Sequence, residues 1–129
     1  MKYFTKHIVV KKEDLDDLDH VNNVRYIQWV QDIAKEHWQA EATPKMIDKY
    51  IWMVRSNYIE YKGQAFLGET LTLKTFIKEA SGAISLRIVE IYHQESQKII
   101  LRSTAEWCLM DKQSKRVTRL TKELTNLFT

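Results

Sequence analysis

Hydrophobic and polar residues follow different periods in the two parts of this chain. Between residues 24 and 43, apolar side chains such as Ile27 and Val30 recur at helical spacing, and aromatic neighbours widen the apolar face. This pattern predicts one long helix that is largely enclosed. The helix should end near Pro44, because proline disfavours helical geometry in the residue before it and has no N–H to donate. A short helical turn is expected at 45–49.

The second part of the chain has the alternation that is typical of strands. Four segments are rich in Ile, Val, Leu, Thr and aromatic residues, namely 51–61, 69–78, 83–93 and 98–110. Short connections separate them, which predicts consecutive antiparallel hairpins. Residues 2–12 alternate weakly and predict one further strand, and residues 121–128 predict a closing short helix.

A single long helix between the first strand and a four-strand meander predicts an α+β fold. The expected architecture is a five-stranded, strongly curved antiparallel sheet wrapped around one long helix, in a single domain over residues 1–129. Such a sheet leaves an edge strand and part of one face uncovered. Pairing between two copies would hide both, so we expect dimerisation.

Composition narrows the classes of function. Hydrophobic residues make up 44% of the 129 residues, which is enough for one core, and no apolar run approaches the length of a membrane span or a signal peptide. We therefore expect a soluble, cytoplasmic protein with no membrane partner. The net charge of +3 comes from interspersed acidic and basic residues. This balance suits phosphate-bearing small molecules or an acidic carrier protein, and we expect no nucleic-acid partner.

Cysteine and histidine usage argues against metal and redox chemistry. Cys108 is the only cysteine, so the chain has no intramolecular disulfide, and neither CxxC nor HExxH spacing occurs. A thiol nucleophile formed by Cys108 with His20 is an alternative. Because Cys108 lies in an apolar strand, we interpret it as a core residue.

Polar residues that can carry chemistry gather just before the predicted helix. Residues 14–29 combine four aspartates, His20 and two asparagines ahead of an aromatic segment. A helix start offers unpaired N–H groups and the positive end of the helix dipole, where an oxygen that gains negative charge can be held while a carboxylate acts on its carbon. The alternative is a solvated acidic turn that caps the helix. Asn22 or Asn23 alone suffices as that cap, so capping does not require the whole polar set.

The same residues carry a family resemblance. Asp-Leu-Asp at 14–16, followed by His-Val-Asn-Asn-Val-Arg-Tyr-Ile-Gln-Trp at 20–29, resembles the signature of hot-dog-fold thioesterases. The sequence is most similar to plant and bacterial acyl-ACP thioesterases and, more loosely, to 4-hydroxybenzoyl-CoA thioesterase. Weaker similarity at 58–61, 68–69 and 119–124 extends the resemblance over nearly the whole chain. It implies the hot-dog fold, and the motif is specific for the superfamily rather than for a substrate.

The resemblance also implies roles for four residues. Asp16 would act on the thioester, either as the nucleophile or as the base that activates water. His20 would orient water or the carboxylate, and the backbone N–H near Asn23 would bind the thioester oxygen. Gln64, in the loop after the second strand, would hold water or polarise the ester.

Two positions depart from the family pattern. The plant enzymes have asparagine where this chain has Leu18, and many bacterial relatives have glycine where it has Asp19. The resemblance therefore does not fix how the attacking water is held.

An acyl thioesterase for acyl-CoA or acyl-ACP is the function that the resemblance implies. The carboxylate is ionised near neutral pH and the thioester carbon is electrophilic, so we expect neither cofactor nor metal. The family assembles as homodimers or homotetramers with the substrate between subunits, where Gln64 would act across the interface. Two alternatives stay open: a non-catalytic acyl-binding hot-dog protein, and a hot-dog dehydratase acting on hydroxyacyl thioesters.

Overall fold

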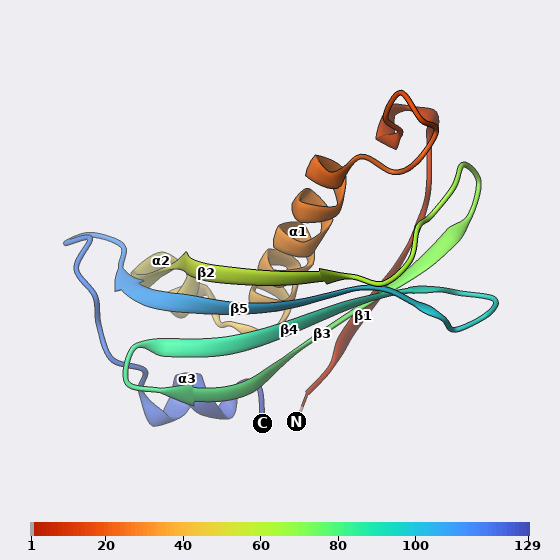
Figure 1. The fold of residues 1–129 in the computed structure, drawn as a ribbon. Helices are drawn as coiled ribbons and strands as arrows, with labels where there is room; N and C mark the ends of the chain where they lie inside the picture. The colour runs from red at the N-terminus through yellow and green to blue at the C-terminus, as the bar shows by residue number, and fades with distance from the viewer. Residues whose placement is uncertain (1) are drawn as a thin grey trace.

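The computed structural model describes residues 2–129 and contains a five-stranded sheet with one long helix over it (Figure 1). In chain order the elements are β1 (Phe4–Val9), a 3₁₀ turn η1 (Lys12–Asp14), α1 (Asn23–Glu41), α2 (Pro44–Lys49), β2 (Tyr50–Tyr61), β3 (Thr70–Ser81), β4 (Ile84–His93), β5 (Ile99–Asp111) and α3 (Lys122–Asn126). The predicted α+β fold, the long helix and the five strands are confirmed.

The order of strands differs from the predicted meander at one place. All neighbouring strands are antiparallel, in the order β1-β3-β4-β5-β2. The hairpins β3–β4 and β4–β5 are confirmed, but the prediction of a β2–β3 hairpin is wrong, because β2 pairs with β5 at the edge of the sheet.

The loop after β2 explains this difference. Residues 62–69 are too many for the short turns that close most hairpins. At its start the loop follows β5, where the Gly63 N–H donates to the Ile100 carbonyl over 3.1 Å. At its end it reaches β1, where the Gly68 N–H donates to the Val10 carbonyl over 2.9 Å. The loop therefore crosses from one edge of the sheet to the other.

The long helix begins and ends at the signals that the sequence contains. At its start, the side-chain oxygen of Asn22 accepts a hydrogen bond from the Val24 N–H over 3.0 Å. At its end, the chain turns extended at Ala42, and Thr43 then caps α2 with Pro44 in the first helical turn. Proline thus ends one helix and begins the next.

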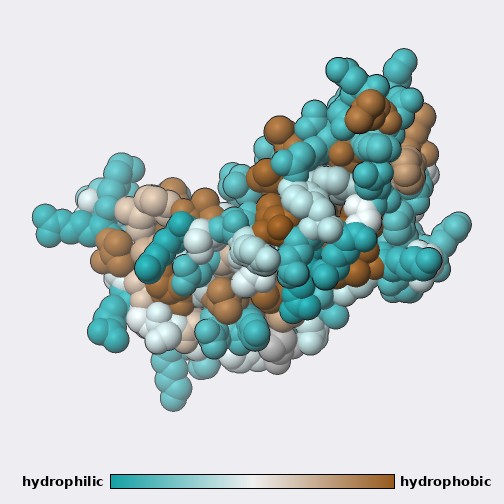
Figure 2. Space-filling view, in the orientation of Figure 1, coloured by the Kyte–Doolittle hydropathy of each residue, from teal (hydrophilic) through white to brown (hydrophobic). Residues whose placement is uncertain are grey.

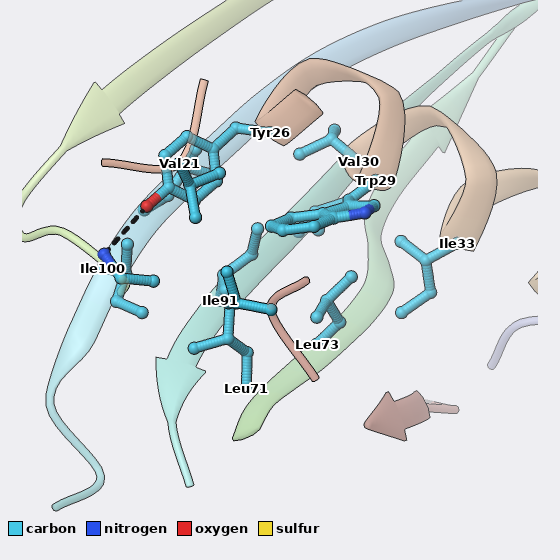
Figure 3. Packing of buried hydrophobic residues seen from close by; sticks show 13 residues of the cluster. Val21, Tyr26, Trp29, Val30, Ile33, Leu71, Leu73, Ile91 and Ile100 are labelled. Carbon is cyan, nitrogen blue, oxygen red and sulfur yellow. Dashed lines mark hydrogen bonds between the residues drawn. The ribbon is translucent and has the colours of Figure 1, made fainter. Parts of the chain in front are cut away.

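The apolar face of α1 packs on the concave face of the sheet. Trp29, Val30 and Ile33 point from the helix toward a layer of buried side chains from the strands, including Leu73 and Ile91 (Figure 3). Each such side chain contributes about 1.5–3 kcal/mol of stability on burial. This core fixes the position of α1, and with it the position of the helix start.

A second cluster closes the other end of the sheet. Met46 from α2, Leu109 from β5 and Leu124 from α3 are buried together, and Trp38 and Trp52 pack against them. The neighbouring Cys108 on β5 is only half-buried, so its prediction as a core residue holds in part.

The outer edge of β2 is uncovered in the single chain. Large apolar side chains are exposed along this strand, namely Ile51, Met53, Val54, Tyr58 and Tyr61. Patches of hydrophobic surface lie along the central band that β2 and β5 occupy (Figure 2). Among residues 2–129, none of the helices has the length and apolar character that crossing a bilayer would require.

Candidate active site

The segment between β1 and α1 folds into a compact loop. Leu15 and Val21 form an antiparallel bridge, and the Asp16 N–H donates to the His20 carbonyl over 2.7 Å. The Asp19 N–H donates a hydrogen bond to the Asp16 carbonyl over 3.1 Å, and Asp19 has a φ of +61°. Aspartate tolerates this left-handed backbone better than most residues do. The loop thus closes on itself and presents Asp16 at its beginning.

The two carboxylate oxygens of Asp16 have different surroundings. Oδ1 accepts hydrogen bonds from the Leu18 N–H over 2.8 Å and from the His20 N–H over 3.1 Å. Oδ2 has no hydrogen-bond partner within residues 2–129, and the residue is only half-buried. One oxygen therefore holds the loop, while the other stays available to a ligand or to water.

Asp14 stabilises the same loop through its buried carboxylate. It is only 7% exposed, and its Oδ2 accepts a hydrogen bond from the Lys11 N–H over 2.8 Å. Its Oδ1 lies 3.0 Å from Nε of Arg25 on α1, and its backbone carbonyl accepts from the Asn22 N–H over 2.8 Å. The carboxylate of Asp14 therefore fixes the loop against the first turn of the helix.

Replacing Asp14 with alanine should lower the free energy of unfolding by about 2 kcal/mol, because the Lys11 N–H loses its hydrogen bond to a buried, charged carboxylate. The ion pair adds little to this value, since the Arg25 side chain is partly exposed and can be solvated. Urea unfolding measures the change. Asp14→Asn is the matched control, since its amide oxygen can still accept from Lys11; equal losses in both variants would contradict this role.

The helix start leaves one backbone donor free. The Val24 N–H is capped by the Asn22 side chain, and the Arg25 and Tyr26 N–H groups donate to the Asn22 carbonyl over 2.9 and 3.2 Å. The N–H of Asn23 has no hydrogen-bond partner within residues 2–129. An unpaired amide at the positive end of a helix suits an oxygen that gains negative charge.

The side chain of Asn23 is hydrogen-bonded to a tyrosine. Its Oδ1 accepts a hydrogen bond from the hydroxyl of Tyr61, the last residue of β2. Burial raises the pKa of Tyr61, which keeps this phenol protonated and able to donate at neutral pH. The Asn23 side chain therefore links the helix start to β2 through its oxygen, and the backbone N–H of Asn23 is left for a ligand.

The loop after β2 lies against the motif. The Val21 N–H donates to the Ala65 carbonyl over 3.4 Å, and the Ala65 N–H donates to the Tyr26 hydroxyl over 3.1 Å, the dashed line in Figure 3. The rings of His20 and Phe66 meet edge to face, with their centroids 5.6 Å apart. Gln64 precedes Ala65 directly, so the loop brings it to the same end of the helix.

The structure thus brings together the segments that hold the four predicted residues, without linking their side chains. The His20 ring contacts Phe66, and no hydrogen bond within residues 2–129 joins it to the Asp16 carboxylate. The side chain of Gln64 is exposed. Neither the partly open cavity under the far half of α1 nor the groove beside Glu69 is lined by any of the four.

Sequence reasoning missed three side chains that shape this site. Asp14 belongs to the quoted motif but was not given a role, and Tyr26 and Tyr61 were assigned to a helix face and a strand. The hydrogen-bond partner of Tyr26 lies 39 residues away along the chain, and that of Tyr61 lies 38 residues away. No local pattern signals such a contact. Residues 2–129 contain no group of three or more His, Cys, Asp or Glu side chains that is placed to bind a metal.

Comparison with known proteins identifies the family. The sequence matches the family model of the acyl-ACP thioesterase N-terminal domain over residues 1–128. The chain belongs to this family, within the superfamily of hot-dog-fold thioesterases. No curated protein sequence matches the chain.

Solved structures share the fold at low sequence identity. A variant of 4-hydroxybenzoyl-CoA thioesterase in complex with 4-hydroxybenzoyl-CoA superposes with a TM-score of 0.89 at 12% identity, over 100% of both chains. The 1,4-dihydroxy-2-naphthoyl-CoA thioesterase of Synechocystis gives 0.83 at 17% identity, over 98% of this chain and 95% of that one. The 12:0-ACP thioesterase of Umbellularia californica gives 0.83 at 14% identity, over 98% of this chain but 51% of that one. The hot-dog fold is therefore confirmed.

Proposed function

We propose that this protein hydrolyses an acyl thioester of coenzyme A or of an acyl carrier protein to the free acid and the thiol. The observation that supports this most is the pair of unpaired groups in one short segment, Oδ2 of Asp16 and the N–H of Asn23. Hydrolysis of a thioester needs one group to act at the carbonyl carbon and another to accept charge on the carbonyl oxygen.

Two routes lead to the same products. In the first, Oδ2 of Asp16 attacks the thioester carbon, the C–S bond breaks to release the thiolate, and water hydrolyses the resulting anhydride. In the second, the Asp16 carboxylate takes a proton from water, the water oxygen bonds to the carbon, and the thiolate leaves and is protonated. In both, the Asn23 N–H donates to the oxygen that carries the negative charge. His20 would position the water, and neither route uses a cofactor.

The choice of carrier rests on the relatives. The bacterial and plant proteins compared above are named for CoA and for acyl-carrier-protein thioesters, respectively. A net charge of +3 favours both carriers, since each is anionic. We therefore propose the thioester of either carrier as the substrate class.

A thioester panel tests this function. The full chain is incubated with acyl-CoA and acyl-carrier-protein thioesters of several chain lengths, the released thiol is followed by its absorbance with a thiol reagent, and the products are identified by mass spectrometry. We expect free acid and free thiol. Binding without thiol release would support the acyl-binding alternative, and an enoyl product from a hydroxyacyl thioester would support the dehydratase.

We further propose that the active site forms between two copies of the chain. The outer edge of β2 is free to pair with the same strand of a second copy about a two-fold axis, and its exposed apolar side chains would be buried there. With the two-fold axis near Tyr61, where β2 ends directly before the loop that holds Gln64, this pairing would bring the partner's loop near the motif. A homodimer is the simplest such assembly, and two dimers would give a homotetramer.

Replacing Met53 with arginine should dissociate the dimer. Met53 is 53% exposed on β2, and the substitution would place one positive charge from each subunit inside the proposed apolar interface. Sedimentation velocity at several concentrations measures the change in mass. Val9→Arg is the matched control, because Val9 is 52% exposed on the opposite edge strand, β1. A dimer that persists in Met53→Arg but dissociates in Val9→Arg would place the interface at β1.

Mixing two inactive variants tests whether Gln64 acts across the interface. If it does, mixed dimers of Asp16→Asn and Gln64→Ala subunits contain one site with both native residues. Random mixing should then restore about a quarter of the wild-type activity. If Gln64 acts within its own subunit, no mixed site is complete and the mixture stays as inactive as its components.

A further inference from the structure

A partly open cavity of about 270 Å³ lies at the end of the sheet that is flanked by α2 and α3 (Figure 1). Its walls are mainly apolar and aromatic, with three indoles and a phenyl ring among them, those of Trp38, Trp52, Trp107 and Phe128. Ligand pockets in proteins usually measure about 300–1,000 Å³, so this volume suits a small organic molecule rather than a long acyl chain.

One side chain in the cavity wall carries a charge. Arg87, on β4, is only 5% exposed. Its two hydrogen bonds both use Nη1, to Nδ1 of His37 over 2.9 Å and to Oγ1 of Thr75 over 3.0 Å. Within residues 2–129, Nε and Nη2 have no hydrogen-bond partner, and no carboxylate forms an ion pair with this guanidinium.

Within residues 2–129, the guanidinium of Arg87 lies over the Phe128 ring, 5.6 Å from its centroid, but no acidic side chain balances its charge. Burial lowers the pKa of Arg87 to about 10, so the guanidinium is still charged at neutral pH. His37 supplies no negative charge, since burial and the nearby guanidinium lower its pKa to about 4 and leave the ring neutral. The other charged side chains lining the cavity are those of Lys35, Lys78, Lys112 and Glu79, of which three are cationic.

A buried arginine is rarely left without an acidic partner, because burying an unpaired charge is costly. Here the free N–H groups of the guanidinium border a cavity instead of a protein carboxylate. A carboxylate in the cavity would accept two parallel hydrogen bonds from such a fork, which is the strongest arrangement open to this pair. The aromatic walls would then enclose the hydrocarbon part of the same molecule.

We propose that this cavity is a binding site for a small apolar carboxylic acid, whose carboxylate pairs with Arg87 and whose hydrocarbon body packs against Trp38 and Trp52. The site is separate from the Asp16 loop. The nearest residue of α1 that lines it, Ala34, is about 16 Å along the helix from Asn23, and the buried side chains of Trp29, Val30 and Ile33 fill the stretch between them. The inference therefore does not rest on the proposed hydrolysis.

Octanoate and octanamide are a matched pair of probes, since they share the chain and differ in charge. Each is titrated into the protein of residues 1–129 at pH 7. Binding is followed by tryptophan emission, because three indoles line the cavity, and by calorimetry. We expect saturable binding of octanoate and at least a tenfold weaker affinity for octanamide. Equal affinities, or no saturable binding of octanoate, would overturn the proposal.

Three variants locate the bound acid. Arg87→Met should remove the preference for octanoate, and circular dichroism shows whether it folds. Ala80→Leu places a larger side chain in the cavity wall and leaves Arg87 unchanged, so it should weaken the binding of both probes. This variant tests the site even if Arg87→Met does not fold. Asp16→Asn should bind octanoate as the wild type does, whatever its effect on hydrolysis. Binding that survives Ala80→Leu, or is lost in Asp16→Asn, would place the acid elsewhere and refute the site.

Discussion

Replacing Asp16 with asparagine should lower kcat for thioester hydrolysis by about 10²- to 10⁴-fold, the range that general acid–base groups usually contribute. Asparagine lacks the negative charge that both proposed routes require. Its side-chain oxygen can still accept the hydrogen bonds that Oδ1 receives from Leu18 and His20. The loop should therefore keep its conformation, and the free energy of unfolding should change little. Steady-state rates of thiol release and urea unfolding of the same samples measure the two effects separately.

Asp17→Asn is the matched control for this variant. Asp17 is the adjacent residue, it is exposed, and its carboxylate has no hydrogen bond within residues 2–129. The same change of charge one residue away should leave kcat within about twofold, since a solvated surface charge interacts weakly with the site. Activity that survives in Asp16→Asn, or is lost equally in both variants, would refute the proposed role of Asp16.

Lowering the pH from about 6.5 to 4 should reduce the free energy of unfolding by about 3 kcal/mol through His37 alone. The ring is fully buried, stacks on Phe4 and meets Phe128 edge to face, and its Nε2 finds no hydrogen-bond partner among residues 2–129. Burial, then the charge of Arg87, lower its pKa from 6.5 to about 4. Because the folded state resists protonation, the unfolded state binds more protons between these values. Stability therefore falls as the pH falls through this window, and it is fully present above pH 6.5.

Urea unfolding at several pH values between 4 and 7 measures this effect against His37→Gln. Glutamine does not titrate, and its side-chain oxygen can still accept from Nη1 of Arg87 in place of Nδ1. Carboxylates and the other histidines titrate in both proteins, so the difference between the two curves isolates His37. A difference that stays constant across the window would show that the ring does not resist protonation.

The molecule has one group of buried charged side chains at each end of the long helix. At one end, the carboxylate of Asp14 fixes the loop that presents Asp16, and it is paired with backbone and with Arg25. At the other end, Arg87 is held by His37 and Thr75 without an acid. The packed core under α1 lies between them, so substitutions at one end should leave binding at the other unchanged.

The position of Asp16 was predictable, but its hydrogen bonds were not. The motif placed a carboxylate just before a helix start, and the structure confirms that position. Which of its two oxygens is free depends on how residues 15–21 fold back on themselves, with Asp19 in a left-handed conformation. The free amide of Asn23 likewise depends on which groups the Asn22 carbonyl and side chain accept.

The sequence by itself determined the long helix, the five strands and their approximate bounds, because apolar period, caps and proline act over a few neighbouring residues. Only the tertiary structure decided that β2 lies beside β5 instead of β3, because strand pairing depends on where a loop of several residues leads. It also decided that Arg87 is buried beside His37, although the two lie 50 residues apart. Local patterns carry no information about such contacts, since these arise only when distant elements pack around a common core.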